Sequence, residues 1–244
     1  MCGIGGVFNA DRQQTVDRQL LVNMAAIQAH RGPDGFGVEV LDQAGVGFCH
    51  ARLSIIDLNV SRDRQPFLTD DGEVLMAHNG EFYDIQRIRA DLTAQGVRFS
   101  SKSDSEILLR LYQRQGLEAT LPLLRGEFSF ALFDRADDCL YLVRDRFGIK
   151  PQYWAMTPEG LVFGSELKVL FAHPAVERRF TAEGLFHQLM QTMVPGTTAF
   201  AGVHQVKPGH VLKVQRVNGR LQVSESTYWY FDFPLNDQRD SSRT

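Results

Sequence analysis

Hydrophobic and polar positions along this chain follow two patterns, the spacing of a helix and the alternation of a strand. Apolar residues return every three or four positions in several stretches, as on the buried face of an amphipathic helix. This spacing predicts helices over residues 17–29, 84–95, 106–115, 118–124, 166–171 and 182–191. Short apolar or alternating runs predict strands over residues 3–8, 37–41, 46–51, 73–78, 128–132, 139–143, 152–156, 161–165, 211–217 and 222–224.

Tight turns join most of the predicted strands. Asp70-Asp71-Gly72 and Asn79-Gly80 are turn signals, and residues 134–138 form a polar turn between two apolar runs. Residues 53–57 are expected to continue in extended form beyond Arg52. Antiparallel strands can be joined by such short connections, whereas parallel strands need longer crossovers. We therefore expect an α+β fold in which helices pack outside antiparallel sheets.

Composition limits the class of protein. The chain has 244 residues and a formal net charge of −3, which gives no electrostatic reason to expect nucleic acid or an anionic membrane as a partner. No apolar run is long enough to span a bilayer, and no basic segment followed by an apolar one indicates a signal peptide. We expect one domain over residues 1–232 and a polar tail or linker over residues 233–244.

The cysteines and histidines show no spacing typical of a metal site. Three cysteines, Cys2, Cys49 and Cys139, leave an odd count, which suits a reducing cytoplasm. Cys49 and Cys139 lie in apolar strand-like runs and are expected to be packing residues. No two of the seven histidines are spaced as His-x-x-x-His, so we expect them to be structural or on the surface. No metal site is predicted.

Cys2 is the first candidate for chemistry. It follows the initiator methionine and precedes Gly3, Gly5 and Gly6. If Met1 is removed, Cys2 carries a thiol and a free α-amine, which is a nucleophile with its own base. An α-amine with a pKa of about 7.7–8.0 is the better resident base at neutral pH. The alternative is a small residue among flexible glycines at an ordinary chain start.

Three further positions have both a chemical and an ordinary reading. Asn79-Gly80 can supply two N–H donors to an oxyanion, or it can be a type I′ hairpin turn. Arg52 can hold a carboxylate with its planar guanidinium, or it can be a solvated charge at a strand end. Asp104 can bind a substrate ammonium, or it can cap the helix that follows it.

Six short motifs, taken together, resemble one family. In order they are Met1-Cys2-Gly3-Ile4, His30-Arg31-Gly32-Pro33-Asp34, Arg52-Leu53-Ser54-Ile55, Asn79-Gly80-Glu81, Ser103-Asp104-Ser105-Glu106 and Arg144-Asp145-Arg146-Phe147-Gly148-Ile149-Lys150-Pro151. This order resembles the N-terminal glutaminase domain of glutamine-dependent asparagine synthetases, which are class II glutamine amidotransferases. Pro33 favours that branch, because the related glucosamine-6-phosphate synthase domain has tyrosine there.

The resemblance implies a fold and a set of roles. The fold would be the N-terminal-nucleophile hydrolase fold, a four-layer α/β/β/α sandwich of two antiparallel sheets. Cys2 would attack the side-chain amide of L-glutamine, giving a glutamyl thioester that water hydrolyses to glutamate after ammonia has left. Asn79 and Gly80 would hold the oxyanion. The resemblance implies that the substrate is bound by Arg52, at the carboxylate, by Glu81 and Asp104, at the α-ammonium, and by the backbone near Leu53 and Ile55.

The synthetase half of that family has no counterpart here. Its Ser-Gly-Gly-x-Asp-Ser loop, which binds the pyrophosphate of ATP, matches nothing in these residues. We therefore expect no cofactor in this chain, and ATP and Mg²⁺ only in a synthetase domain or partner protein that receives ammonia. A homodimer is compatible with the resemblance. Two alternatives stay open, a non-catalytic glutamine-sensing or docking module and the glutaminase half of another amidotransferase.

Overall fold

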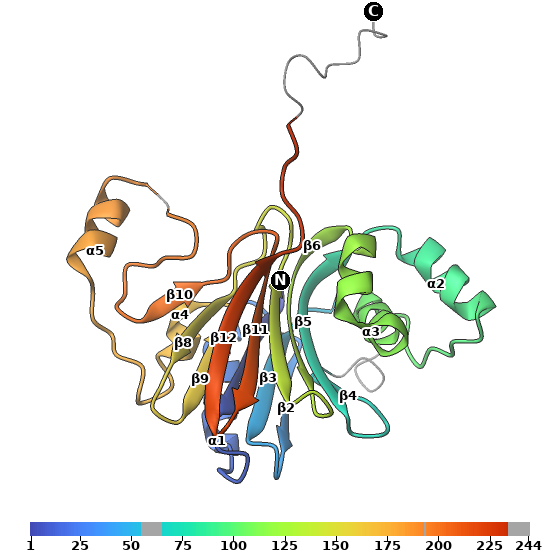
Figure 1. The fold of residues 1–244 in the computed structure, drawn as a ribbon, viewed down its shortest axis with the longest axis horizontal. Coiled ribbons are helices and arrows are strands. Elements are labelled where there is room, and N and C mark those ends of the chain that lie inside the picture. The colour runs from blue at the N-terminus through green and yellow to red at the C-terminus, as the bar shows by residue number, and fades with distance from the viewer. Residues whose placement is uncertain (55–64, 193, 234–244) are drawn as a thin grey trace, which may run out of the picture.

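The fold consists of two antiparallel sheets with helices on their outer faces (Figure 1). The structure is a computed structural model that describes residues 1–54, 65–192 and 194–233. Sheet A has the strand order β10-β8-β9-β1-β3-β2. Its strands, in chain order, are β1 (Gly3–Asn9), β2 (Gly35–Leu41), β3 (Val46–Arg52), β8 (Tyr153–Met156), β9 (Gly160–Gly164) and β10 (Val203–Gln205).

Sheet B has the order β12-β11-β7-β6-β5-β4. Its strands are β4 (Phe67–Leu68), β5 (Val74–Phe82), β6 (Gly126–Asp134), β7 (Cys139–Arg144), β11 (His210–Val217) and β12 (Arg220–Thr227). The helices are α1 (Arg18–Ile27), α2 (Ile85–Ala94), α3 (Asp104–Thr120), the 3₁₀ helix η1 (Leu121–Leu123), α4 (Leu167–Leu170) and α5 (Ala182–Leu189).

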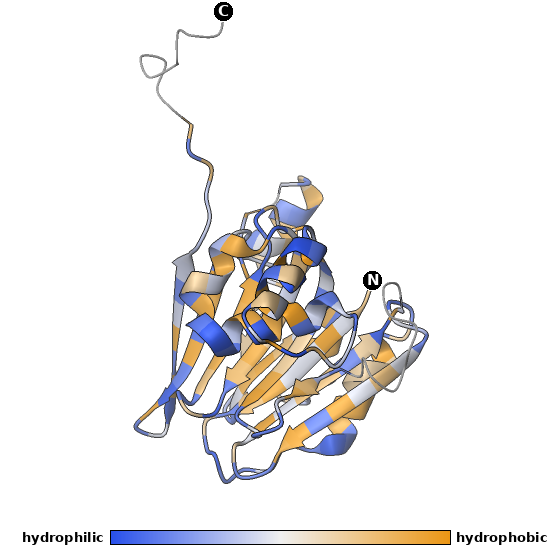
Figure 2. Cartoon of the chain, turned by 90° about the vertical axis from the view of Figure 1, so that its right-hand side faces the viewer, coloured by the Kyte–Doolittle hydropathy of each residue, from blue (hydrophilic) through white to orange (hydrophobic). Residues whose placement is uncertain are grey.

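Three apolar clusters define four layers. One cluster packs α1 and α4 on sheet A through residues such as Leu21 and Val169. A second lies between the sheets and includes Phe48 and Phe133. The third packs α2 and α3 on sheet B and includes Ile107. Figure 2 shows hydrophobic residues on the strands and hydrophilic ones at the hairpin ends. The predicted α/β/β/α sandwich of antiparallel sheets is confirmed.

Local signals place the helix ends. The Asp17 side chain accepts a hydrogen bond from the Gln19 N–H at the start of α1, and Ser103 does the same for Ser105 at the start of α3. Gly116 has φ 74° and ψ 176°, so it interrupts the long helical stretch where the sequence predicted a helix end. Ser103, rather than Asp104, is the N-cap of α3.

The structure corrects several local expectations. Asn79-Gly80 is not a turn, because both residues lie inside β5 and pair with Ser129 and Phe128 of β6. The strand β3 ends at Arg52, and Leu53 and Ser54 continue without strand pairing, while residues 55–57 of the predicted extension lie outside the described residues. The short strands β4 and β10 were not predicted from the sequence.

Two further features concern surfaces. Helix α5 has no buried residue and exposes Leu189. Figure 1 shows it beside sheet A, away from the outer helices of sheet B. Within the described ranges, no helix is long and apolar enough to cross a membrane.

Candidate active site

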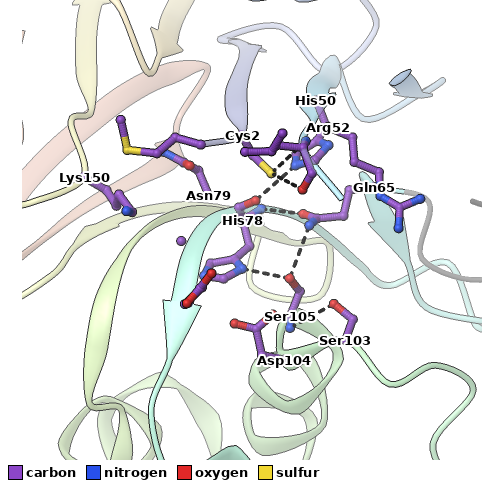
Figure 3. Close-up of a pocket in the computed structure, with 14 residues that line it drawn as sticks. Cys2, His50, Arg52, Gln65, His78, Asn79, Ser103, Asp104, Ser105 and Lys150 are labelled. Carbon is purple, nitrogen blue, oxygen red and sulfur yellow. Dashed lines mark hydrogen bonds between the residues drawn. The ribbon is translucent and has the colours of Figure 1, made fainter. Parts of the chain in front are cut away.

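One pocket collects most of the residues that the sequence singled out (Figure 3). It lies where the ends of β1, β3 and β5 meet the first turn of α3. The predicted residues that line it are Cys2, Arg52, Leu53, Asn79, Gly80, Glu81 and Asp104. Ile55 lies outside the described residues. The lining residues without a predicted role are Met1, His50, Gln65, His78, Ser103, Ser105 and Lys150.

Cys2 is held by the segment that follows β3. The Leu53 N–H donates to the Cys2 Sγ at 3.4 Å, and the thiol donates to the Leu53 carbonyl at 3.6 Å. The Arg31 Nε donates to the Cys2 carbonyl at 3.0 Å, and the Ile4 N–H donates to the Ser165 hydroxyl at 3.0 Å. Cys2 is half-buried, whereas Cys49 and Cys139 are fully buried, as expected of packing residues. Of the three thiols, only that of Cys2 faces the pocket.

The motif at residues 30–34 positions the other side of this wall. The Asp34 carboxylate accepts a hydrogen bond from the Ser54 N–H at 2.7 Å, and the Asp34 N–H donates to the Arg52 carbonyl at 3.0 Å. A Cβ on Gly32 would meet the Ala51 carbonyl oxygen at 2.4 Å, so this close approach requires glycine. The motif thus fixes the backbone of Arg52, a residue that is only 6% exposed.

The Gly80 N–H points toward the pocket, which follows from the alternation along β5. The Val74 carbonyl accepts a hydrogen bond from the Thr69 N–H, the His78 N–H donates to Gln65 and the Phe82 N–H donates to Asp104. Even-numbered residues of β5 therefore direct their backbone groups away from β6. Gly80 has the same parity. Its φ is 146°, and a Cβ there would meet the Glu127 carbonyl oxygen at 2.1 Å.

The Asn79 side chain is the least satisfied polar group in the pocket. It is fully buried, and neither its amide nitrogen nor its amide oxygen has a hydrogen-bond partner in the part of the chain that the structure describes. Buried amides are almost always hydrogen-bonded, and one without a partner costs about 1–3 kcal/mol. Such a group at a pocket is suited to bind a ligand.

The pocket also holds a buried carboxylate. The Asp104 Oδ2 accepts a hydrogen bond from the Phe82 N–H at 2.9 Å, and the residue is only 5% exposed. Burial raises the pKa of Asp104, and hydrogen bonds from the Phe82 and Ser105 backbone oppose that rise. A cation beside Asp104 would favour its charged form. Glu81, half-buried, is a second carboxylate on the same pocket.

Two histidines that the sequence left without a role lie in the pocket wall. The His50 Nε2 lies 3.1 Å from the His78 carbonyl and donates to it, since a carbonyl only accepts. The His78 ring stacks on Phe82 with ring centroids 4.6 Å apart, and its Nδ1 lies 2.8 Å from the Ser105 Oγ. Burial lowers the pKa of both His50 and His78 to about 3. Both are neutral and are weak bases at neutral pH.

Lys150 reaches the pocket from a tightly bonded loop at residues 144–151. The Arg144 guanidinium donates to the carbonyls of Lys150, Gly148 and Val206 at 2.6–2.8 Å. The Asp145 carboxylate accepts hydrogen bonds from the N–H groups of Phe128, Phe147, Ile149 and Lys150 at 2.9–3.2 Å. The buried Lys150 ammonium pairs with the Glu127 carboxylate at 3.3 Å.

No group of three or more His, Cys, Asp or Glu side chains is arranged to hold a metal ion within the described ranges. The side chains that do meet in the pocket are a thiol, a neutral amide, carboxylates and cations. This set is suited to bind a small zwitterion and to act on it with a thiol.

The chain matches the model of a known protein family, the glutamine amidotransferase domain, over residues 1–229. It is 37% identical over 251 residues to Amidase chry2 of Gibberella zeae, covering 98% of this chain and 36% of that protein. It is 32% identical over 237 residues to the glutamine-hydrolysing asparagine synthetase 2 of Bacillus subtilis, covering 94% of this chain and 30% of that protein.

A solved structure supports the fold. The glutamine phosphoribosylpyrophosphate amidotransferase of B. subtilis superposes with a TM-score of 0.66 at 17% identity, over 93% of this chain and 49% of that one. The chain spans about a third of the length of the curated relatives it matches.

Proposed function

Since the chain belongs to the glutamine amidotransferase family, we propose that it hydrolyses the side-chain amide of glutamine through a thioester on Cys2. The single observation that carries this proposal is that a thiol and a buried amide without a partner in the described residues line one pocket. The Asn79 amide is buried without a partner in the described residues, and the Gly80 N–H is directed toward the same pocket as Cys2. Two such donors suit the oxyanion that forms when a thiolate attacks an amide.

The reaction proceeds in two steps. The Cys2 thiolate attacks the side-chain amide carbon, and the tetrahedral oxyanion accepts hydrogen bonds from Asn79 and Gly80. The C–N bond then breaks, the leaving nitrogen takes the proton that came from the thiol, and ammonia departs. Water attacks the resulting glutamyl thioester, the C–S bond breaks, and glutamate leaves with the thiol restored.

The base in this scheme is the α-amine of Cys2. His50 and His78 are poor candidates, because burial lowers the pKa of each to about 3. The α-amine belongs to Cys2 only after Met1 has been removed. The Met1 side chain lines the same pocket, so its removal would free the base and open space for the substrate.

Charged groups at the rest of the pocket suit an amino acid. Arg52 would pair with the α-carboxylate, and Asp104 with Glu81 would bind the α-ammonium. Burial raises the pKa of Asp104, and an ammonium beside it would favour its charged form. The backbone at Leu53 would line the substrate, and the same role is proposed for Ile55.

The ammonia would serve an amide-forming partner. Because the chain spans about a third of relatives that include glutamine-hydrolysing asparagine synthetases, we propose that a synthetase domain or partner protein receives it. ATP and Mg²⁺ would act only there. The acceptor is asparagine's precursor or another carboxylate that the partner selects.

Glutamate release from glutamine by the purified chain tests the proposal. We expect release that disappears in Cys2→Ala and persists in Cys49→Ala, since Cys49 is buried in the core. Intact mass shows whether Met1 has been removed from the protein assayed. If a chain that begins at Cys2 binds glutamine but releases no glutamate, it is a binding module and the proposed hydrolysis is wrong.

A further inference from the structure

Among the residues that the structure describes, the outer edge of β5 has only the short strand β4 as a neighbour. The strand β4 pairs only with Leu75 and Met76 of β5. Beyond that point, the alternation along β5 turns the backbone groups of His78, Gly80 and Phe82 away from β6, and His78 and Gly80 line the pocket. An unpaired, buried strand edge is unfavourable, because each backbone N–H and C=O needs a partner.

Side chains take the place of the missing strand at two of these three residues. The His78 N–H donates to the Gln65 Oε1 at 2.7 Å, and the His78 carbonyl accepts from the His50 Nε2 at 3.1 Å. The Phe82 N–H donates to the Asp104 Oδ2 at 2.9 Å. Gly80 is therefore presented between two residues whose backbone groups are held by side chains.

Gln65 joins this edge to the start of α3. Since its Oε1 accepts from a backbone N–H, its Nε2 must be the atom that donates to the Ser105 Oγ, at 3.2 Å. The Ser105 Oγ lies 2.8 Å from the His78 Nδ1, which closes a ring of contacts. Gln65 is 7% exposed and Ser105 is 3% exposed, so water competes little for these bonds.

We propose that Gln65 is a positioning residue that holds the two ends of the substrate site in one geometry. One end of its amide orients the strand that carries Asn79 and Gly80, and the other orients the helix turn that carries Asp104. This inference rests on the proposed glutamine hydrolysis, which needs both ends at once. A displacement of about 1 Å at such a site can cost about a hundredfold in rate.

Gln65→Met tests the proposal, because methionine has a similar length and neither amide group. We expect kcat/KM for glutamine to fall by about 10–100-fold. Alkylation of Cys2 by iodoacetamide, followed by peptide mass, needs no oxyanion donor and is expected to stay within about twofold. The matched control is Gln113→Met, an exposed glutamine on α3, which should leave both rates unchanged.

Ser105→Ala and the double variant show whether the two residues act together. Both substitutions break the same link. We therefore expect the loss in log(kcat/KM) of the double variant to be smaller than the sum of the losses of the two single variants. If kcat/KM in Gln65→Met stays within twofold of the parent, the proposal is wrong. If hydrolysis, alkylation and melting temperature all fall together, Gln65 only stabilises the fold and the proposal is also wrong.

Amide hydrogen exchange separates this inference from the proposed function. In Gln65→Met, exchange should become faster at the Phe82 N–H, which Gln65 does not touch but Asp104 holds. If the parent protein releases no glutamate but Phe82 responds, the proposed hydrolysis fails and the link from Gln65 to Asp104 stands. Unchanged exchange at Phe82 would overturn the link.

Discussion

The loop at residues 144–151 and the edge of β5 at residues 78–82 line one pocket but treat their buried polar groups differently. In the loop, the Arg144 guanidinium donates hydrogen bonds to backbone carbonyls, and the Asp145 carboxylate accepts them from backbone N–H groups. On β5, the Asn79 amide is buried and has no partner in the described residues. The first arrangement stabilises a shape, and the second lowers stability where a ligand is expected to bind.

The largest expected effect on stability is in the loop at residues 144–151, whose buried polar groups are hydrogen-bonded. Asp145→Ala would leave four backbone N–H groups without their acceptor, and the free energy of unfolding should fall by about 3–5 kcal/mol. Denaturant unfolding measures this. Asp137→Ala, at an exposed position, is the control and should change the free energy by less than about 0.5 kcal/mol. A loss in Asp145→Ala as small as that in Asp137→Ala would mean that these hydrogen bonds contribute little to stability.

The Asn79 amide on β5, which has no partner in the described residues, should matter more for activity than for stability. Asn79→Ala should lower kcat for glutamine by about 10²–10³, or about 2.7–4 kcal/mol, while the free energy of unfolding changes by less than about 1 kcal/mol. Steady-state kinetics and denaturant unfolding on one preparation measure both. The exposed Asn23→Ala is the control. A stability loss as large as that of Asp145→Ala, with kcat retained, would contradict the distinction.

Gly80 is expected to matter for both stability and activity, because its backbone is strained and its N–H faces the pocket. Gly80→Ala should lower the free energy of unfolding by about 2–3 kcal/mol, since a Cβ meets β6 and φ is 146°. Gly72 has φ 73°, and no atom lies within 4 Å of an added Cβ. Gly72→Ala therefore measures backbone strain alone and should lower the free energy of unfolding by about 1 kcal/mol. Equal losses would mean that contact with β6 is unimportant.

Acid should weaken the β5 edge. Burial lowers the pKa of His50 and His78 to about 3, so between pH 6.5 and 3 the unfolded chain binds protons that the folded chain does not. Stability therefore falls as pH falls, by about 2 kcal/mol per histidine at pH 5. Unfolding at pH 7 and pH 5 measures it. His78→Asn should show a smaller decrease than the parent, and an equal decrease would contradict the assignment.

A residue outside both regions should have the smallest effect. Leu189 on α5 is 74% exposed, and Leu189→Ser should change the free energy of unfolding by less than about 0.5 kcal/mol. Thermal melting of the isolated chain measures this. A larger loss would show that α5 contributes to the core through contacts that its exposure does not suggest.

The sequence by itself determined the fold class and most elements. Alternation and helical spacing are local, so β1, β3 and α1 could be predicted within a few residues of their ends. The motif order pointed to the family before any contact was known. The candidate residues Cys2, Arg52, Asn79 and Asp104 were also found this way, and the structure brings them to one pocket.

Only the tertiary structure decided how that pocket is built. Asn79-Gly80 carries a strong local turn signal, but pairing with Ser129 and Phe128 overrides it, because the long antiparallel pairing of β5 with β6 keeps both residues within a strand. Gln65 and His78 show no signal in the sequence, since their importance lies in bonds to residues distant along the chain. Chemical type can be predicted from sequence, whereas the partner of each polar group depends on the folded arrangement.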